Sequence, residues 1–174
     1  MAARSSLGKL SARAANALFV IVAPGVVGLA APLALHFLSP EYLRFDVEPV
    51  RYAGAAALVC GLLLYALGMR TQMRAGESPS PLVASRTLVT DGVYRACRNP
   101  MYVAGAFYFV GLAALLQSWL LAAYSLAVIL LYYPFLVGTE ERALRRAFGA
   151  EYDAYCAATP RWAPRLSWPK SRRA

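Results

Sequence analysis

The feature that most constrains this chain is the gathering of its apolar residues into four segments. The first has no charged side chain, the second has only Arg51 near one end, and Gln117-Ser118 alone separates the last two. A helix needs about 17–25 mainly apolar residues to cross a bilayer. The pattern therefore predicts an all-α integral membrane bundle in which the last two of four transmembrane helices form a tight hairpin. The predicted spans are 16–38, 50–69, 101–116 and 119–138.

The positive charges predict how this bundle is oriented. Sixteen of the 18 lysines and arginines lie before the first span, in the segment 70–100, or after residue 138, and only Arg44 and Arg51 lie on the other side. Basic loops stay in the cytoplasm. We therefore expect both termini and the segment 70–100 to be cytoplasmic, in a bacterial inner membrane. The first span has a longer apolar core than a cleaved signal peptide, so we expect it to be retained.

The net charge of +9 does not predict nucleic-acid binding, because the basic residues are dispersed beside apolar spans. Attraction to the anionic lipids of the cytoplasmic leaflet is the simpler interpretation, and Trp162 suits the headgroup level. The three cysteines form no CxxC pair, so we predict neither a disulfide framework nor a metal site. The length predicts a single domain over residues 1–174.

The residues that follow the fourth span predict an amphipathic cytoplasmic helix over 140–158. Thr139 is a suitable N-cap, and Glu140 and Glu141 in the first turn would favour the helix dipole. Four apolar or aromatic residues share one face of this helix, which could then roof the bundle. They are Leu144, Phe148, Tyr152 and Tyr155.

Two polar clusters flank the predicted hairpin. Arg98 and Tyr102 stand where the third span begins, and Glu140 and Glu141 follow the fourth. A tight hairpin would bring both clusters to the same end of the bundle. Arginine can clamp a carboxylate or phosphate, glutamate can accept from hydroxyl or amino groups, and tyrosine faces favour cations. The set suits a nucleotide-like, partly cationic ligand; the alternative is that Arg98 only neutralises a glutamate at the interface.

At these residues the sequence resembles the integral-membrane methyltransferases related to isoprenylcysteine carboxyl methyltransferase and to phospholipid N-methyltransferases. The resemblance covers roughly residues 76–166, and two linked motifs at matching separation carry it. The first motif is Gly92, Tyr94, Arg98-Asn99-Pro100 and Tyr102, and the second is Glu140-Glu141, Leu144, Phe148-Gly149, Tyr152 and Tyr155.

The resemblance implies an S-adenosylmethionine pocket that opens to the cytoplasm and a lipophilic acceptor that enters from the bilayer. It implies catalytic roles for Arg98, Glu140 and Glu141, and substrate contacts for Arg161, Trp162 and Tyr133. The cofactor-binding residues that it implies are Tyr94, Arg98, Asn99, Pro100, Tyr102, Glu140 and Glu141.

The methyl acceptor stays open between a phospholipid amine, an isoprenylcysteine-like carboxylate and another small lipophilic nucleophile. Isoprenylcysteine enzymes have histidine at the position of Asn99, and asparagine cannot titrate near neutral pH. Two other functions are also open: a non-enzymatic membrane protein that keeps the fold, and an NADPH-dependent reductase of the sterol-reductase type.

Overall fold

The computed structural model describes residues 22–77 and 85–162, and every regular element within these ranges is helical. The first predicted span begins outside the described residues. Its described part is a widely wound π-helix, η1 (Val22–Ala30), which continues into α2 (Ala31–Leu38). A short 3-10 turn, η2 (Glu41–Leu43), then leads to α3 (Glu48–Arg74).

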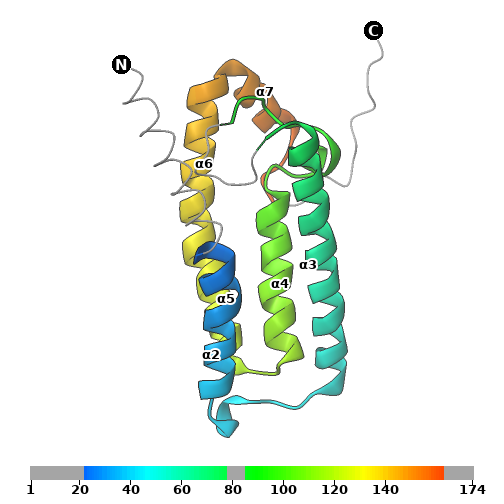
Figure 1. Ribbon diagram of the computed structural model, residues 1–174, viewed down its shortest axis with the longest axis vertical. Helices are drawn as coiled ribbons and strands as arrows, with labels where there is room; N and C mark the ends of the chain where they lie inside the picture. Colours follow the sequence, from blue (N-terminus) through cyan, green and yellow to red (C-terminus); the bar gives the residue numbers. More distant parts are fainter. Residues whose placement is uncertain (1–21, 78–84, 163–174) are drawn as a thin grey trace, which may run out of the picture.

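The helices that follow are a short 3-10 turn, the hairpin and the extension of the hairpin. They are η3 (Gly92–Arg95), α4 (Pro100–Leu115), α5 (Trp119–Ala127), η4 (Val128–Tyr132), α6 (Tyr133–Phe148) and α7 (Ala150–Ala158). Figure 1 shows α2 beside α5, α4 in the middle and α3 on the other side. Helix α6 continues α5 beyond the bundle, and α7 turns back toward the end where α4 begins. We call this the site end.

Glycines on α3 let it approach α4 very closely. A Cβ atom at Gly54 would lie 2.5 Å from the backbone nitrogen of Leu115, and one at Gly61 would lie 2.7 Å from the carbonyl oxygen of Ala104. Gly68, seven residues further on, continues the same stripe. Small residues at this spacing allow helix backbones to touch. The stripe holds α3 and α4 in an antiparallel arrangement, so the end of α3 lies beside the start of α4.

The turn of the hairpin lies at the opposite end. Gln117 has a φ of 49°, and the hydroxyl of Ser118 caps α5 by accepting from the backbone N–H of Leu121 at 3.3 Å. The Gln117 side chain donates to the carbonyl of Val47 at 2.7 Å and accepts from Arg51 at 2.9 Å. The predicted tight hairpin is thus present, and its turn is tied to the start of α3.

Among residues 22–77 and 85–162, two helical segments are long and apolar enough to cross a membrane, Glu48–Arg74 and the continuous helix Trp119–Phe148. The helices Gly25–Leu38 and Pro100–Leu115 are apolar but shorter than 18 residues. The prediction of an all-helical bundle holds for the described residues. Of the four predicted spans, length and composition support two.

The predicted separate helix over 140–158 is wrong. Helix α6 runs unbroken from Tyr133 to Phe148, so the chain leaves the apolar segment without leaving the helix. Thr139 is therefore inside a helix, and its hydroxyl donates to the carbonyl of Phe135, four residues back, at 2.9 Å. The break comes at Gly149, whose φ of +50° ends α6 and starts α7.

A wide turn precedes the proline of α6. The N–H of Tyr133 donates to the carbonyl of Val128, five residues back, and the π-helical turn η4 spans Val128–Tyr132. Pro134 follows at once and has no N–H to donate. Prolines and π-helical turns are both causes of bends in helices, and here the two occur side by side at the start of α6.

Candidate active site

A cavity of about 400 Å³ lies among η1, α3, α4, η4 and α6. Most of its wall is apolar or aromatic, and tyrosines from α3, η3, α4, η4 and α6 are among the lining residues. At the site end its lining becomes polar. The aromatic residues of the wall include Tyr65, Tyr102, Tyr108, Phe109, Tyr132 and Tyr133.

A second, small pocket of about 60 Å³ adjoins the polar end of this cavity. It is lined by the segment 85–89, by Glu77, and by Leu144, Tyr152 and Tyr155 of the overlying helices. Five side chains line both spaces. We call them the shared wall, and they are Gln72, Tyr94, Arg98, Asn99 and Glu140.

Gln72 belongs to this wall although the sequence motifs do not include it. Its Nε2 donates to the Tyr94 hydroxyl at 2.6 Å, and the Tyr155 hydroxyl donates to the Tyr94 carbonyl at 2.7 Å. Burial raises the pKa of Tyr94, so this phenol stays protonated at neutral pH. The signal for Gln72 was its position four residues after Gly68, on the face of α3 that packs against α4.

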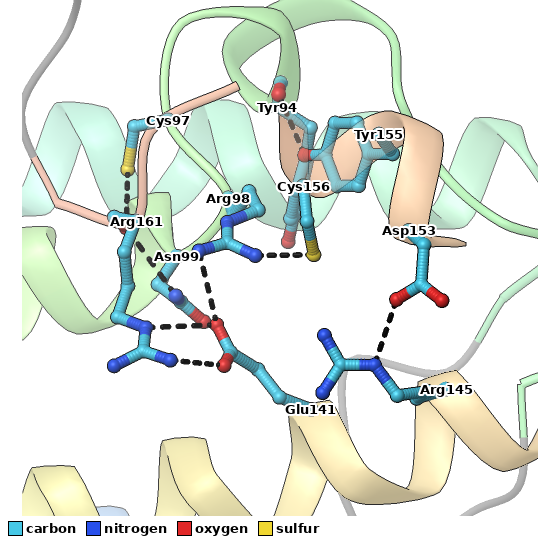
Figure 2. A network of polar contacts seen from close by, with 10 residues as sticks. All are labelled: Tyr94, Cys97, Arg98, Asn99, Glu141, Arg145, Asp153, Tyr155, Cys156 and Arg161. Atoms are coloured by element: carbon cyan, nitrogen blue, oxygen red, sulfur yellow. Dashed lines mark hydrogen bonds and ion pairs between the residues drawn. The ribbon is translucent and has the colours of Figure 1, made fainter. Parts of the chain in front are cut away.

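The two adjacent glutamates of α6 point to different partners. Glu140 lines both spaces, and its Oε2 accepts from the Tyr102 hydroxyl at 3.0 Å. Glu141 is buried and lines neither space. Its carboxylate accepts from Arg161 at 3.0 and 2.5 Å and lies 3.7 Å from Nη2 of Arg98 (Figure 2).

The loop that leads into α4 carries the first motif. The backbone N–H of Arg98 donates to the Pro160 carbonyl at 2.9 Å, and Asn99 Nδ2 donates to the Arg161 carbonyl at 3.3 Å. The Arg98 Nη1 group also contacts the Cys156 sulfur (Figure 2). Pro100 then occupies the first turn of α4, where its missing N–H costs no helical hydrogen bond.

The structure thus brings most of the predicted site residues together. Tyr94, Arg98, Asn99, Pro100, Tyr102, Tyr133 and Glu140 all line the large cavity. Tyr133 is buried, and a side chain at Gly105 would overlap its hydroxyl. Arg161 and Trp162 line neither space: Arg161 pairs with Glu141, and Trp162 is 40% exposed. Their contact with a substrate stays a prediction.

Two buried polar atoms of the shared wall have no hydrogen-bond partner among the described residues. They are the donor Nε of Arg98 and the acceptor Oε1 of Gln72. Leaving buried polar groups without partners costs free energy, so such atoms mark places where a ligand can gain hydrogen bonds. The wall therefore offers one donor and one acceptor at the junction of a polar and an apolar space.

Comparisons with known proteins give one family and several similar proteins whose names differ in the role that they describe. The model of the family described as phospholipid methyltransferase matches residues 50–151. The nickel-cobalt-cadmium resistance protein NccN of Alcaligenes xylosoxydans xylosoxydans is 42% identical over 83 residues, which cover 48% of this chain and 38% of that protein. The cobalt-zinc-cadmium resistance protein CzcN of Cupriavidus metallidurans is 40% identical over 83 residues, which again cover 48% of this chain and 38% of that protein.

A third relative is an enzyme by name. The protein-S-isoprenylcysteine O-methyltransferase of Schizosaccharomyces pombe is 29% identical over 130 residues, which cover 72% of this chain and 54% of that protein. The matches thus span about half of these relatives' length or less. The family match covers more than half of the chain and includes nearly all of α3, the hairpin, the first motif, and the second motif as far as Gly149. The chain therefore belongs to the phospholipid methyltransferase family of membrane proteins.

Proposed function

We propose that this protein is an S-adenosylmethionine-dependent methyltransferase whose acceptor is a lipophilic molecule held in the membrane. The observation that supports this most is the shared wall, where a polar pocket and an apolar, aromatic cavity meet. A methyl transfer from a polar donor to a lipid-soluble acceptor requires such a junction. Because the spaces meet at five side chains, the transfer would take place beside them.

The residues of the wall fit the cofactor's chemical groups. S-adenosylmethionine carries a carboxylate, an amino group and ribose hydroxyls, and supplies an activated methyl group. The unpartnered Nε of Arg98 is a charged donor suited to the carboxylate. The unpartnered Oε1 of Gln72 and the carboxylate of Glu140 are acceptors suited to the amino group or the hydroxyls.

The chain's contribution to the reaction would be positioning and the exclusion of water. Helices α3 and α4 pack with their backbones in close contact, which holds Gln72 of α3 in place relative to Arg98 and Asn99, the two residues that lead into α4. The apolar cavity keeps water from the reacting groups. A carboxylate acceptor needs no base. An amine acceptor must lose a proton, and Glu140 is the carboxylate of the shared wall that can take it, on an oxygen of its side chain.

We also propose an orientation of the protein in the membrane and three chemical classes of methyl acceptor. The basic residues of segments 70–100 and 139–174 support a site end that faces the cytoplasm, in a single domain over 1–174 with four spans. A phospholipid amine, an isoprenylcysteine-like carboxylate or another lipophilic nucleophile would enter the cavity from the bilayer. The isoprenylcysteine relative and the family's name support these classes.

Calorimetry on the purified protein in detergent tests the cofactor. We expect saturable binding of S-adenosylmethionine and of S-adenosylhomocysteine, and weaker or no binding of NADPH. Arg98→Ala should abolish the binding. Arg142→Ala is the matched control, because Arg142 is an exposed arginine of α6 that contacts Thr139 and lines neither space.

The outcomes of this calorimetry distinguish a methyltransferase from a reductase and from a non-enzymatic protein. Saturable NADPH binding without S-adenosylmethionine binding would favour a reductase, and no binding of either would favour a non-enzymatic role. The acceptor is then found by incubating the protein with labelled S-adenosylmethionine and a bacterial lipid extract, and identifying the methylated product by mass spectrometry.

A further inference from the structure

The segment that follows α7 crosses the site end and is held there by Glu141. We infer that Glu141 is a positioning residue that fastens this segment, Pro160–Trp162, which we call the strap. The inference rests on the proposed function, in which the neighbouring Glu140 faces the ligand. The two adjacent glutamates then have different roles: Glu140 contacts the ligand, and Glu141 holds the strap in place over the site.

Within the described residues, the hydrogen bonds and ion pairs of the Glu141 carboxylate are with two arginines. Nε and Nη2 of Arg161 donate to its two carboxylate oxygens at 3.0 and 2.5 Å, which is a bidentate pair. Nη2 of Arg98 lies 3.7 Å from Oε1. The Glu141 side chain is 11% exposed. Because Arg161 occupies both oxygens and Glu141 lines neither space, this carboxylate is not available to a ligand in the structure.

The strap reaches the first motif through its backbone. The Pro160 carbonyl accepts from the N–H of Arg98 at 2.9 Å, and the Arg161 carbonyl accepts from Asn99 at 3.3 Å and from the Cys97 thiol at 3.5 Å (Figure 2). These three contacts bind consecutive residues of the loop. The Glu141–Arg161 pair anchors the other side of the strap on α6. The strap thus joins the first motif to the second.

Glu141 also positions Arg98. Within the described residues, the Arg98 guanidinium contacts Glu141 through Nη2 and Cys156 through Nη1, which leaves Nε without a partner. Nε is the atom that we assign to the ligand. Held on its other side by Glu141 and Cys156, the guanidinium has little freedom to turn away from the shared wall. Loss of Glu141 should therefore release the strap and disorder Arg98 together.

Amide hydrogen exchange, followed by mass spectrometry, tests the fastening without any cofactor. The N–H of Arg98 donates to the strap, so its exchange rate reports whether the strap is docked. Glu141→Gln and Arg161→Gln should each raise this rate by roughly ten-fold or more, the change expected when a hydrogen bond between charged groups is lost. Arg161 is about half exposed, so its replacement does not threaten folding.

A double-mutant cycle identifies the pair. If Glu141 acts through Arg161, the double variant should exchange at Arg98 no faster than either single variant. Glu140→Gln should leave the rate unchanged, as should Asp153→Asn, which breaks the exposed Arg145–Asp153 pair between α6 and α7. Peptides from the middle of α3 should be unchanged in all variants, which separates a local release from general destabilisation.

Unchanged Arg98 exchange in both Glu141→Gln and Arg161→Gln would overturn the inference, as would equal acceleration by Glu140→Gln. The calorimetric arm uses S-adenosylhomocysteine as the probe. Loss of its binding in Glu141→Gln with normal Arg98 exchange would make Glu141 a direct ligand and would also overturn it. Failure of the wild-type protein to bind the probe would refute the proposed function alone, because the exchange experiment still decides the role of Glu141.

Discussion

Replacing Gly61 with alanine is expected to push α3 and α4 apart and to deform the large cavity. The new Cβ would lie 2.7 Å from the carbonyl oxygen of Ala104 and 2.9 Å from the backbone nitrogen of Tyr108. Ordinary contacts begin at 3.4 Å, so the helices must separate by 3.4 − 2.7 = 0.7 Å. Both obstacles are backbone atoms, which cannot swing away as a side chain would.

Two opposing effects determine how much Gly61→Ala changes the free energy of unfolding. Alanine favours a helix over glycine by about 0.5–1 kcal/mol, whereas overpacking a close interface costs about 1–3 kcal/mol. The net result should be a loss of about 0.5–2 kcal/mol in the free energy of unfolding. Because Gly61 also lines the large cavity, the acceptor should bind more weakly as well.

The assay is reversible unfolding of the detergent-solubilised protein, followed by circular dichroism as denaturant is added. Gly138→Ala is a matched control of opposite sign. Within the part of the chain that the structure describes, a Cβ there would meet only the end of the Arg142 side chain, at 3.6 Å, so the helix preference of alanine should stabilise α6 by about 0.5–1 kcal/mol. Equal stabilisation by both substitutions would refute the close contact of α3 with α4.

Three further predictions concern the site end. Tyr102→Phe removes the hydroxyl that donates to Glu140, and should weaken S-adenosylhomocysteine binding in calorimetry about ten-fold, as the loss of a hydrogen bond to a charged group implies; unchanged affinity would contradict this. Gln72→Leu should weaken the same binding by a similar factor, while the circular dichroism spectrum stays the same; full affinity would remove Gln72 from the cofactor site. Burial of the Glu77 carboxyl raises its pKa, but hydrogen bonds from Thr87 and from the backbone of residues 86 and 87 outweigh this effect and lower the pKa. The stabilisation of this loop is therefore complete above the unfolded value of about 4.3 and is lost as the pH falls through the lower folded value. The amides of residues 86 and 87, once corrected for intrinsic exchange, should lose protection in that acidic range, and Glu77→Gln should lack this pH dependence.

The helix packing and the meeting of the motifs follow from local sequence patterns. Glycines every seven residues predict a close helix contact, because a residue without a side chain lets the backbones approach one another. Gln117 and Ser118 leave room only for a tight turn, so the two ends of the hairpin must lie side by side. That geometry brings Arg98 near Glu141, as expected.

The errors and omissions have equally physical causes. Hydropathy marks where the chain leaves the apolar layer, whereas a helix ends where its backbone is interrupted. The hydroxyl of Thr139 can cap a helix or bond back to a carbonyl within one, and the sequence does not say which. The sequence does not predict that the strap docks on the first motif. The carbonyl oxygens of Pro160 and Arg161 make these contacts, and every residue type has a carbonyl group.

The wide turn Val128–Tyr132 has a consequence for the length of this chain. A π-helical turn holds one residue more than regular winding needs. Deleting one residue there would restore an ordinary helix and leave Glu140 facing the same way. Deleting one residue between Phe135 and Thr139 would instead rotate everything that follows by about 100°, the advance of a helix per residue. The helix Trp119–Phe148 thus has a turn at which its length can change without turning Glu140 away from the shared wall.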